Sequence, residues 1–583
     1  MTNGTMLRSV PVPFQAILWP LLGAALILAV GRHLPAWLRR LLAAAAAAAS
    51  LAAIWSLRSG DPQRVEIPWL PLNLFRSGPA LSTDGLAVPM ALTLATIAVA
   101  LSLGIGARQA RAPWHGMLLI LLAGGITTAL AGSLLTLAIG GALMDLALIG
   151  LILWCDERSE QSAATEGAEG ASVAERRGSC PAPSLSTAVP GLASTLVLVL
   201  CALRLDAEVG HAMFPARQIP PAILLLAGVA AILRAQIYPL HPRRLQAPTD
   251  AALLLPAGAG LFLLARVQAV APILSAEALP ALFAGMALLA GGLLAWSGSA
   301  AARRMPGHGP GGLWHGLLIH QVAAGVLFAL VLPGQSPWPI LSMLLALTLL
   351  ALWWDAAPEA VSLSLPVPAW LQPVVQRIEP RRRQLAERFP SLDRWRRSWM
   401  GRRGAVLLPA LALASLVGLP FTAGARARWP LYAALLRDGN PGLWSLLAAD
   451  AFLSAGLWLG LRPLLSPARH PRPLALLGMF FLAAVLLLAA LGGGAGLGWQ
   501  PVKIDDVSAW GMGLLYLLPW LVGAWLASLA ARSRRLAPLV QSVVGLDWLY
   551  RVGGWVGRIA EGAGYWLGQV GEGAGCFGWA VII

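Results

Sequence analysis

The chain has 583 residues, of which 58% are hydrophobic and only 12% are charged. Soluble proteins carry about 25% charged residues, so the composition excludes a soluble enzyme, a coiled coil, a disordered protein and a disulfide-rich secreted scaffold. The net charge of +16 is attributed to basic loops of a membrane protein rather than to nucleic-acid binding. We therefore expect an all-α polytopic membrane protein.

Fifteen apolar runs are each near or above the ~18–20 residues that a helix needs to cross a bilayer. They predict about fourteen or fifteen transmembrane helices, whereas a membrane β-barrel would show short alternating segments. The predicted spans are 14–31, 38–57, 86–105, 116–132, 133–154, 187–203, 219–240, 249–272, 276–297, 313–333, 337–356, 404–424, 442–464, 473–496 and 508–531.

Arginines in alternate loops predict the orientation, because basic loops tend to remain in the cytoplasm. With the N-terminus outside, most of the arginine-bearing loops fall inside, including 357–403 with its ten arginines. Arg58, Arg64 and Arg76, in the first long outer loop, and Arg204 and Arg217, in a later one, are exceptions. We expect a multi-pass protein of the bacterial inner membrane.

Four regions are expected along the chain. N-terminal helices occupy 1–132, a first bundle 133–272, a second bundle 273–531 and an amphipathic or lateral helix 532–583.

Two long cytoplasmic loops are predicted within these regions. The loop 155–186 is rich in Ser, Gly, Ala and Glu and is expected to be disordered and mobile, because it has few large apolar residues to bury. The loop 357–403 mixes arginine with tryptophan, which fits a surface amphipathic helix and a solvated linker equally well.

No cofactor or metal site is predicted. Cys155, Cys180, Cys201 and Cys576 have no CxxC or Cys/His ligand spacing. The sequence also has no nucleotide, flavin or iron–sulfur motif, so any redox chemistry would belong to partner subunits.

Ionisable residues inside apolar spans are the candidate functional groups, because a charge in hydrocarbon is costly. Aspartate and histidine can carry a proton near neutral pH, whereas arginine stays protonated and can only set a field or bind a carboxylate. For His320, a buried ring satisfied by a neighbour is an equally good interpretation. The candidate proton-path or charge-switch residues are Asp145, Arg234, His241, His320, Arg428 and Asp450.

Several motifs resemble the antiporter-like membrane subunits of complex I (proton-translocating NADH–quinone oxidoreductase), Mrp-type cation/proton antiporters and membrane-bound hydrogenases. The stretch RAQIYPLH from Arg234 to His241, followed by APT and AALLLPAGAGLFLLAR, is similar to the family's broken-helix signature. TDGL around Asp84, GLPFTAGARARWPLY from Gly418 and GEG near the C-terminus agree in order with further family motifs.

This resemblance implies two broken helices, other membrane-arm subunits as partners, and protons or sodium ions as the transported species. This sequence also departs from the family's motifs at several positions. Arg234 and Arg428 stand where the family has lysine, a histidine of the following span is missing, and Asp145 is displaced from the family's glutamate.

Three hypotheses follow. The first is a membrane-arm subunit of a complex I-like assembly that contributes to proton translocation in respiratory electron transport. The second is a degenerate structural subunit of such an assembly, which does not itself translocate ions. A subunit of an Mrp-type cation/proton antiporter or of a membrane-bound hydrogenase is a further alternative. The third is a stand-alone polytopic enzyme such as a lipid-linked transferase, against which the sequence offers no DxD-like site on a loop.

Two structural predictions test whether these motifs have the structure that the resemblance implies. We predict helix breaks at Pro239–Pro242 and near Gly418–Gly424. We also predict that Arg234 is a fixed charge held by a carboxylate, with Asp145 as its partner.

Overall fold

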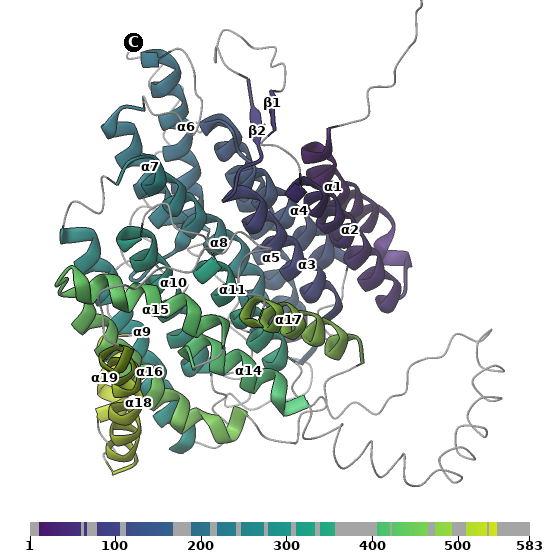
Figure 1. Cartoon of the computed structure of the whole chain (residues 1–583). Coiled ribbons are helices and arrows are strands. Elements are labelled where there is room, and N and C mark those ends of the chain that lie inside the picture. The colour runs from purple at the N-terminus through teal and green to yellow at the C-terminus, as the bar shows by residue number, and fades with distance from the viewer. Residues whose placement is uncertain are drawn as a thin grey trace, which may run out of the picture.

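The structure is a computed structural model of the whole chain (Figure 1). It describes residues 11–59, 63–66, 78–104, 112–166, 188–209, 219–240, 247–272, 278–304, 311–332, 338–355, 405–419, 422–464, 473–491, 509–532 and 536–544. His241, the predicted loop 357–403 and the last 39 residues, 545–583, lie outside these ranges.

The described residues form seventeen α-helices and one short hairpin. The first half holds α1 (Val12–Val30), α2 (Ala36–Ser56), β1 (Arg64–Glu66), β2 (Ala80–Ser82), α3 (Ala87–Gly104), α4 (Ala112–Ala129), α5 (Leu134–Glu166), α6 (Val189–Val209), α7 (Pro221–Ala235) and α8 (Ala247–Val270). The second half holds α9 (Ala278–Arg304), α10 (Gly311–Val331), α11 (Trp338–Asp355), α14 (Ala405–Val417), α15 (Ala423–Arg437), α16 (Gly442–Leu464), α17 (Pro473–Leu491), α18 (Ala509–Arg532) and α19 (Leu536–Val544).

Continuous apolar sequence accounts for these helices, because a helix satisfies its own backbone hydrogen bonds where no water is present. Among the described residues, eight helices are long and apolar enough to cross a bilayer, and six shorter apolar helices accompany them. Each predicted span overlaps a helix in the structure, although α7 ends at Ala235 and α14 at Val417, before the predicted span ends at 240 and 424. The protein is a multi-pass membrane protein.

Helix α5 corrects one boundary. It continues to Glu166, although the sequence analysis ended the span at 154 and expected a disordered loop from 155. The residues from Asp156 to Glu166 include Glu, Gln, Arg and Ala, which favour helix, and neither Gly nor Pro interrupts them before Gly167. The remainder of that predicted loop, 167–186, lies outside the described residues.

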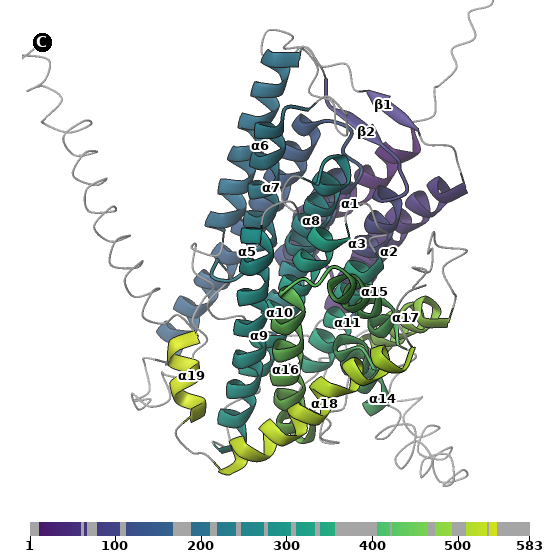
Figure 2. The same ribbon diagram turned by 60° about the vertical axis from the view of Figure 1, so that its left-hand side comes forward.

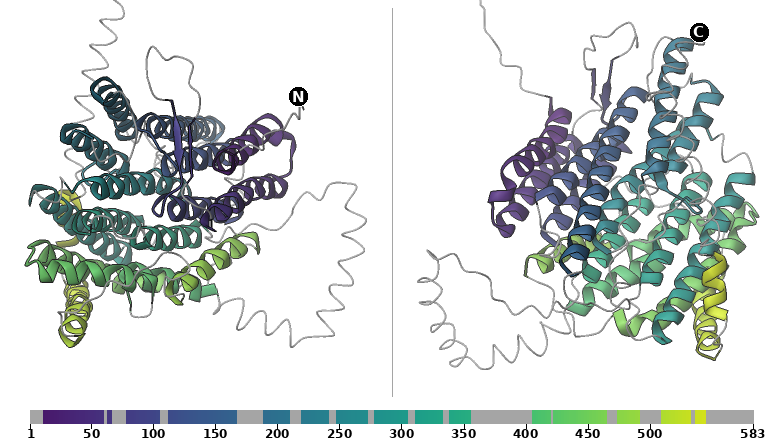
Figure 3. Two further views of the ribbon diagram at one scale, coloured as in Figure 1. Left: turned by 45° about the horizontal axis from the view of Figure 1, so that its top comes forward. Right: turned by 180° about the vertical axis from the view of Figure 1, so that it is seen from behind.

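The helices differ in depth within the bundle (Figures 2 and 3). In the apolar stretch of α3, 89% of the residues are buried, whereas in that of α1 28% are buried. Helix α3 therefore lies in the core of the bundle and α1 at its edge. Exposed Trp19 and Leu22 of α1 face outward, as the side chains of lipid-facing helices do. In the second half, α9 packs against both α10 and α16, and α18 packs against α16.

An ion pair joins distant parts of the first half. Arg266 near the end of α8 donates to Asp84 Oδ2 at 2.5 Å and to the carbonyl of Ala131 at 2.6 Å. The other oxygen of Asp84 accepts the backbone N–H groups of Leu86 and Ala87 and so caps α3. The Asp84–Arg266 pair therefore joins the start of α3, the α4–α5 turn and the end of α8.

The Asp84–Arg266 ion pair predicts unequal losses of folding stability when one or the other residue is replaced. Asp84→Asn keeps a capping oxygen but removes the carboxylate from Arg266, whose side chain is 2% exposed, and should cost about 3–5 kcal/mol. Arg266→Met leaves a carboxylate that is 31% exposed and can regain water, so we expect about 1–2 kcal/mol. Thermal unfolding in detergent measures the stability of both variants. If Arg266→Met were the less stable variant, the proposed role of the ion pair would be wrong.

Candidate functional site

The helix that carries Arg234 ends one residue later. Gln236 follows α7 with left-handed backbone angles (φ 52°, ψ 46°), and the chain leaves the helical path before Pro239. The predicted first break is therefore confirmed, although it starts three residues earlier than the proline. A cation in the last turn of a helix also interacts favourably with the helix dipole.

Arg234 and Asp145 form the predicted buried pair. Arg234 Nη1 lies 2.5 Å from Asp145 Oδ1 and Nη2 lies 3.1 Å from Oδ2, and each side chain is 3% exposed. Nη2 also donates to the Gly191 carbonyl at 3.0 Å and to Thr195 Oγ1. Thr195 in turn donates to Asp145 Oδ2 at 2.6 Å. The two opposite charges compensate each other, and the surrounding polar groups hold them in one geometry.

The second break is built by local sequence. Gly418 has φ +80°, a conformation that glycine adopts without steric cost, and its N–H bonds the Ser415 carbonyl at 3.1 Å. The N–H of Leu419 bonds the Ala414 carbonyl at 2.7 Å, which completes a Schellman ending for α14. Thr422 then caps α15 by accepting from the N–H of Ala425 at 3.2 Å. The predicted break near Gly418–Gly424 is confirmed.

Four side chains meet beside this break. Arg428 Nη1 lies 2.5 Å from Asp450 Oδ1, and Tyr432 donates its hydroxyl to Asp450 Oδ2 at 2.5 Å. His320 Nε2 lies 3.1 Å from Asp450 Oδ1, although its angles are not those of a hydrogen bond. His320 is fully buried and Asp450 is 3% exposed. We call His320, Arg428, Tyr432 and Asp450 the C-terminal network.

The broken helix also supplies a backbone acceptor. The Leu416 carbonyl, in the last turn of α14, has no intrahelical donor because the helix stops. It accepts Arg428 Nη2 at 2.7 Å and Gln321 Nε2 at 2.9 Å. The break thus orients the arginine and connects α10, which carries His320, to the same point.

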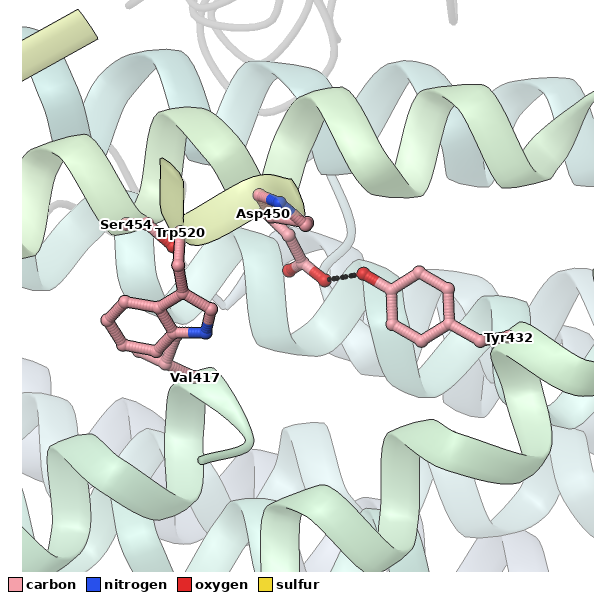
Figure 4. A pocket seen from close by; sticks show the side chains of 6 residues that line it. Val417, Tyr432, Asp450, Ser454 and Trp520 are labelled. Carbon is pink, nitrogen blue, oxygen red and sulfur yellow. Dashed lines mark hydrogen bonds between the residues drawn. The ribbon is translucent and has the colours of Figure 1, made fainter. Parts of the chain in front are cut away.

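A small cavity adjoins this network (Figure 4). Figure 4 shows Tyr432 and Asp450 joined by their hydrogen bond, with Ser454 and Trp520 beside them. Among the described residues, the lining comprises Val417, Tyr432, Asp450, Ser454, Pro519 and Trp520. Asp450 is the one carboxylate of this set, and a proton or water in the cavity would meet it directly.

Helix α8 packs against α7, which carries Arg234, and against α10, which carries His320. Its Gly260 adjoins the Arg234–Ala235 backbone, and its Leu261 contacts Gly325 of α10. From Ala252 to Ala265, every residue of α8 is apolar. This stretch therefore contributes no polar side chain that could pass a proton between the two charged groups.

The structure brings five of the six predicted residues into two separate clusters. Asp145 and Arg234 form one, whereas His320, Arg428 and Asp450 belong to the other, and His241 lies outside the described residues. The sequence analysis missed Thr195 and Tyr432. Tyr432 lies four residues after Arg428 on one helix face, and this spacing could have identified it.

Comparison with known proteins bears on the fold. No protein-family model and no curated protein matches the sequence. Among solved structures, a chain of the Mrp complex from Dietzia sp. DQ12-45-1b aligns with a TM-score of 0.64 and 16% identity. The alignment covers 98% of this chain and 61% of that one, so this chain spans less than two thirds of that relative.

Two respiratory assemblies contain chains of similar shape. A chain of respiratory complex I from Thermus thermophilus aligns with a TM-score of 0.55 and 18% identity, over 83% of this chain and 98% of that one. A chain of the archaeal membrane-bound sulfane sulfur reductase aligns with a TM-score of 0.62 and 15% identity, over 97% of this chain and 98% of that one. The chain has the antiporter-like fold. The architecture expected from the resemblance is thereby confirmed.

Within this antiporter-like fold, the Arg234–Asp145 pair predicts a specific rescue. Arg234→Ala leaves a buried carboxylate behind and should cost about 3–5 kcal/mol, seen as poor accumulation and a lower melting temperature. Adding Asp145→Asn removes that charge and should recover part of the loss.

The matched control is Arg204→Ala on α6, whose side chain is 67% exposed and 4.0 Å from Glu208. An exposed pair of this kind contributes about 0–1 kcal/mol, so the control should melt like the parent protein. A double variant less stable than Arg234→Ala alone would show that the pair is not the reason for the loss.

Proposed function

We propose that this chain is a membrane-arm subunit of a complex I-like assembly and contributes to proton translocation. The antiporter-like fold supports this proposal, as do chains of like shape in respiratory complex I and in the sulfane sulfur reductase. The expected partners are other membrane-arm subunits, and the expected ions are protons or sodium ions. Redox chemistry would belong to those partners.

The C-terminal network is the observation that carries the proposal. It places an imidazole and a carboxylate 3.1 Å apart in the buried bundle, beside a helix break and a small cavity. Imidazole changes charge near neutral pH, and its exchange of a proton with a carboxylate needs only a short rearrangement at this distance. Arg428 remains charged and holds Asp450 by attraction, so that it biases the carboxylate toward its ionised form.

The Arg234–Asp145 pair has a different proposed role. Its guanidinium does not release a proton at physiological pH, and both oxygens of its carboxylate are engaged by Arg234 or Thr195. We assign it as a fixed charge pair that stabilises the first bundle and carries no proton.

Proton translocation can be tested in proteoliposomes that contain the whole parent complex. Asp450→Asn is nearly isosteric but cannot cycle between charged and neutral forms, so we expect at least a tenfold loss of proton uptake, equivalent to about 1.4 kcal/mol. His320→Gln should lower uptake as well. Asp438→Asn is the matched control, because Asp438 is 53% exposed and pairs only with its neighbour Arg437 among the described residues.

The assay separates the proposal from a purely structural role. Assembly is measured in the same preparations by the yield of intact complex. If Asp450→Asn assembled fully and translocated protons at the parental rate, the subunit would be structural and the proposal wrong.

We further propose that the protein lies in a bacterial inner membrane with its N-terminus outside. The distribution of arginine over alternate loops supports this orientation. It places the residues that follow α5, 167–187, in the cytoplasm.

Limited proteolysis tests the orientation. Protease added to inverted vesicles should cleave within 167–187, because this Ser-, Gly- and Glu-rich segment has little apolar surface to bury. The same protease added to right-side-out vesicles should leave it intact. Cleavage only in the right-side-out preparation would reverse the assigned topology.

A further inference from the structure

The cavity beside Asp450 contains a second polar side chain that the proposed proton path does not use. Ser454 lies four residues after Asp450 on α16, so the two side chains share one face of the helix. Ser454 is fully buried, and its hydroxyl has no hydrogen-bond partner among the residues that the structure describes. Buried hydroxyl groups are rarely left in this condition, and a water molecule usually satisfies them where the site is polar.

Helix α18 forms the opposite wall of the cavity. Pro519 and Trp520 line it, and Gly523, one turn further along, lies against α16. A Cβ atom at Gly523 would stand 2.6 Å from Ser454 Cβ and 2.8 Å from the Ala451 carbonyl, so only glycine permits this approach. The close contact of the two helices brings the Trp520 indole to the cavity.

We infer that this cavity is a hydrated proton-exchange site in which Ser454 and Asp450 hold a water molecule and Trp520 limits access to it. The inference rests on the proposed function and extends it by naming where protons meet the C-terminal network. A hydronium ion that transfers its proton to the Asp450 carboxylate leaves a neutral water molecule. The reverse transfer regenerates hydronium, so no further reactant is required.

The chemistry of the lining favours water over a metal cation. Asp450 is the one acidic group among the described residues of the lining, and Arg428 lies 2.5 Å from its Oδ1. The hydroxyls of Tyr432 and Ser454 are weak cation ligands but good partners for water, and the indole N–H of Trp520 is a donor that cannot bind a cation. The described residues also contain no group of three His, Cys, Asp or Glu side chains with metal-binding geometry.

Cysteine accessibility tests hydration independently of transport. Ser454→Cys is introduced into the full-length chain, within its membrane complex, after Cys155, Cys180, Cys201 and Cys576 have been replaced by serine or alanine. The cysteine thiolate attacks a small methanethiosulfonate reagent, forming a mixed disulfide and releasing methanesulfinate, and the thiolate forms only where water is present. Ser102→Cys is the matched control, because Ser102 is also fully buried but donates to the Ala98 carbonyl at 2.7 Å.

The expected result is that the cysteine at position 454 reacts severalfold faster than the one at position 102. Adding Trp520→Ala should raise its rate further, whereas Trp520→Phe, which keeps an aromatic wall and most of the packing, should change it less. Equal rates at positions 454 and 102 would overturn the inference. A rate at position 454 that did not respond to Trp520→Ala, with Trp520→Phe confirming a folded protein, would overturn the role of Trp520.

Proton uptake is measured on separate variants, so that the two proposals fail separately. Ser454→Ala should lower uptake severalfold and Ser454→Thr should restore it, because threonine returns the hydroxyl. Fast labelling combined with normal uptake in Asp450→Asn would contradict the proposed function alone. Absent labelling combined with loss of uptake in Asp450→Asn would contradict the hydrated cavity alone.

Discussion

The pairing of arginine with aspartate inside an apolar bundle is the constraint on which both candidate sites depend. Neither charge could remain in the hydrocarbon region without the other, since an isolated charge there is costly. Arg234 meets Asp145 at 2.5 Å and Arg428 meets Asp450 at 2.5 Å, and each arginine also donates to backbone carbonyl groups. In both places the arginine lies close to a helix break, where backbone groups would otherwise be unsatisfied. The same interaction therefore stabilises the charge and the interrupted helix.

The two pairs are nevertheless not equivalent. Among the described residues, Asp145 forms side-chain hydrogen bonds with Arg234 and Thr195, neither of which can exchange a proton near neutral pH. Asp450 has His320 at 3.1 Å and borders a cavity. The apolar side chains of α8 adjoin both regions, so proton exchange is assigned to the C-terminal network and a structural role to the other pair. Neither Arg234 nor Arg428 can carry a proton, because a guanidinium keeps its proton.

Much of this could be predicted from the sequence, because the signals are local. Apolar runs locate the spans, Gly418 and Pro239 indicate the breaks, and the cost of an isolated charge predicts that Arg234 needs a carboxylate such as Asp145. The sequence did not reveal the contact between Asp84 and Arg266, because neither residue lies in the middle of an apolar span where a lone charge would call for a partner. Asp84 and Arg266 are 182 positions apart and meet only because α3 and α8 begin and end at the same level. The extension of α5 to Glu166 was not predicted, because the Ser-, Gly- and Glu-rich composition of 155–186 indicates a loop even though its first residues favour helix.

The central claim is that proton transfer is confined to the C-terminal network. The most direct test replaces the whole first pair with apolar residues of similar size, Arg234→Met with Asp145→Leu, and measures protons translocated per substrate turnover in the purified complex. Such a replacement of a buried ion pair is often neutral for stability. If the pair is a fixed charge insulated by α8, the number of protons translocated per turnover should equal the parental value. A loss of translocation with the complex fully assembled would contradict the claim and place the first pair on the proton path.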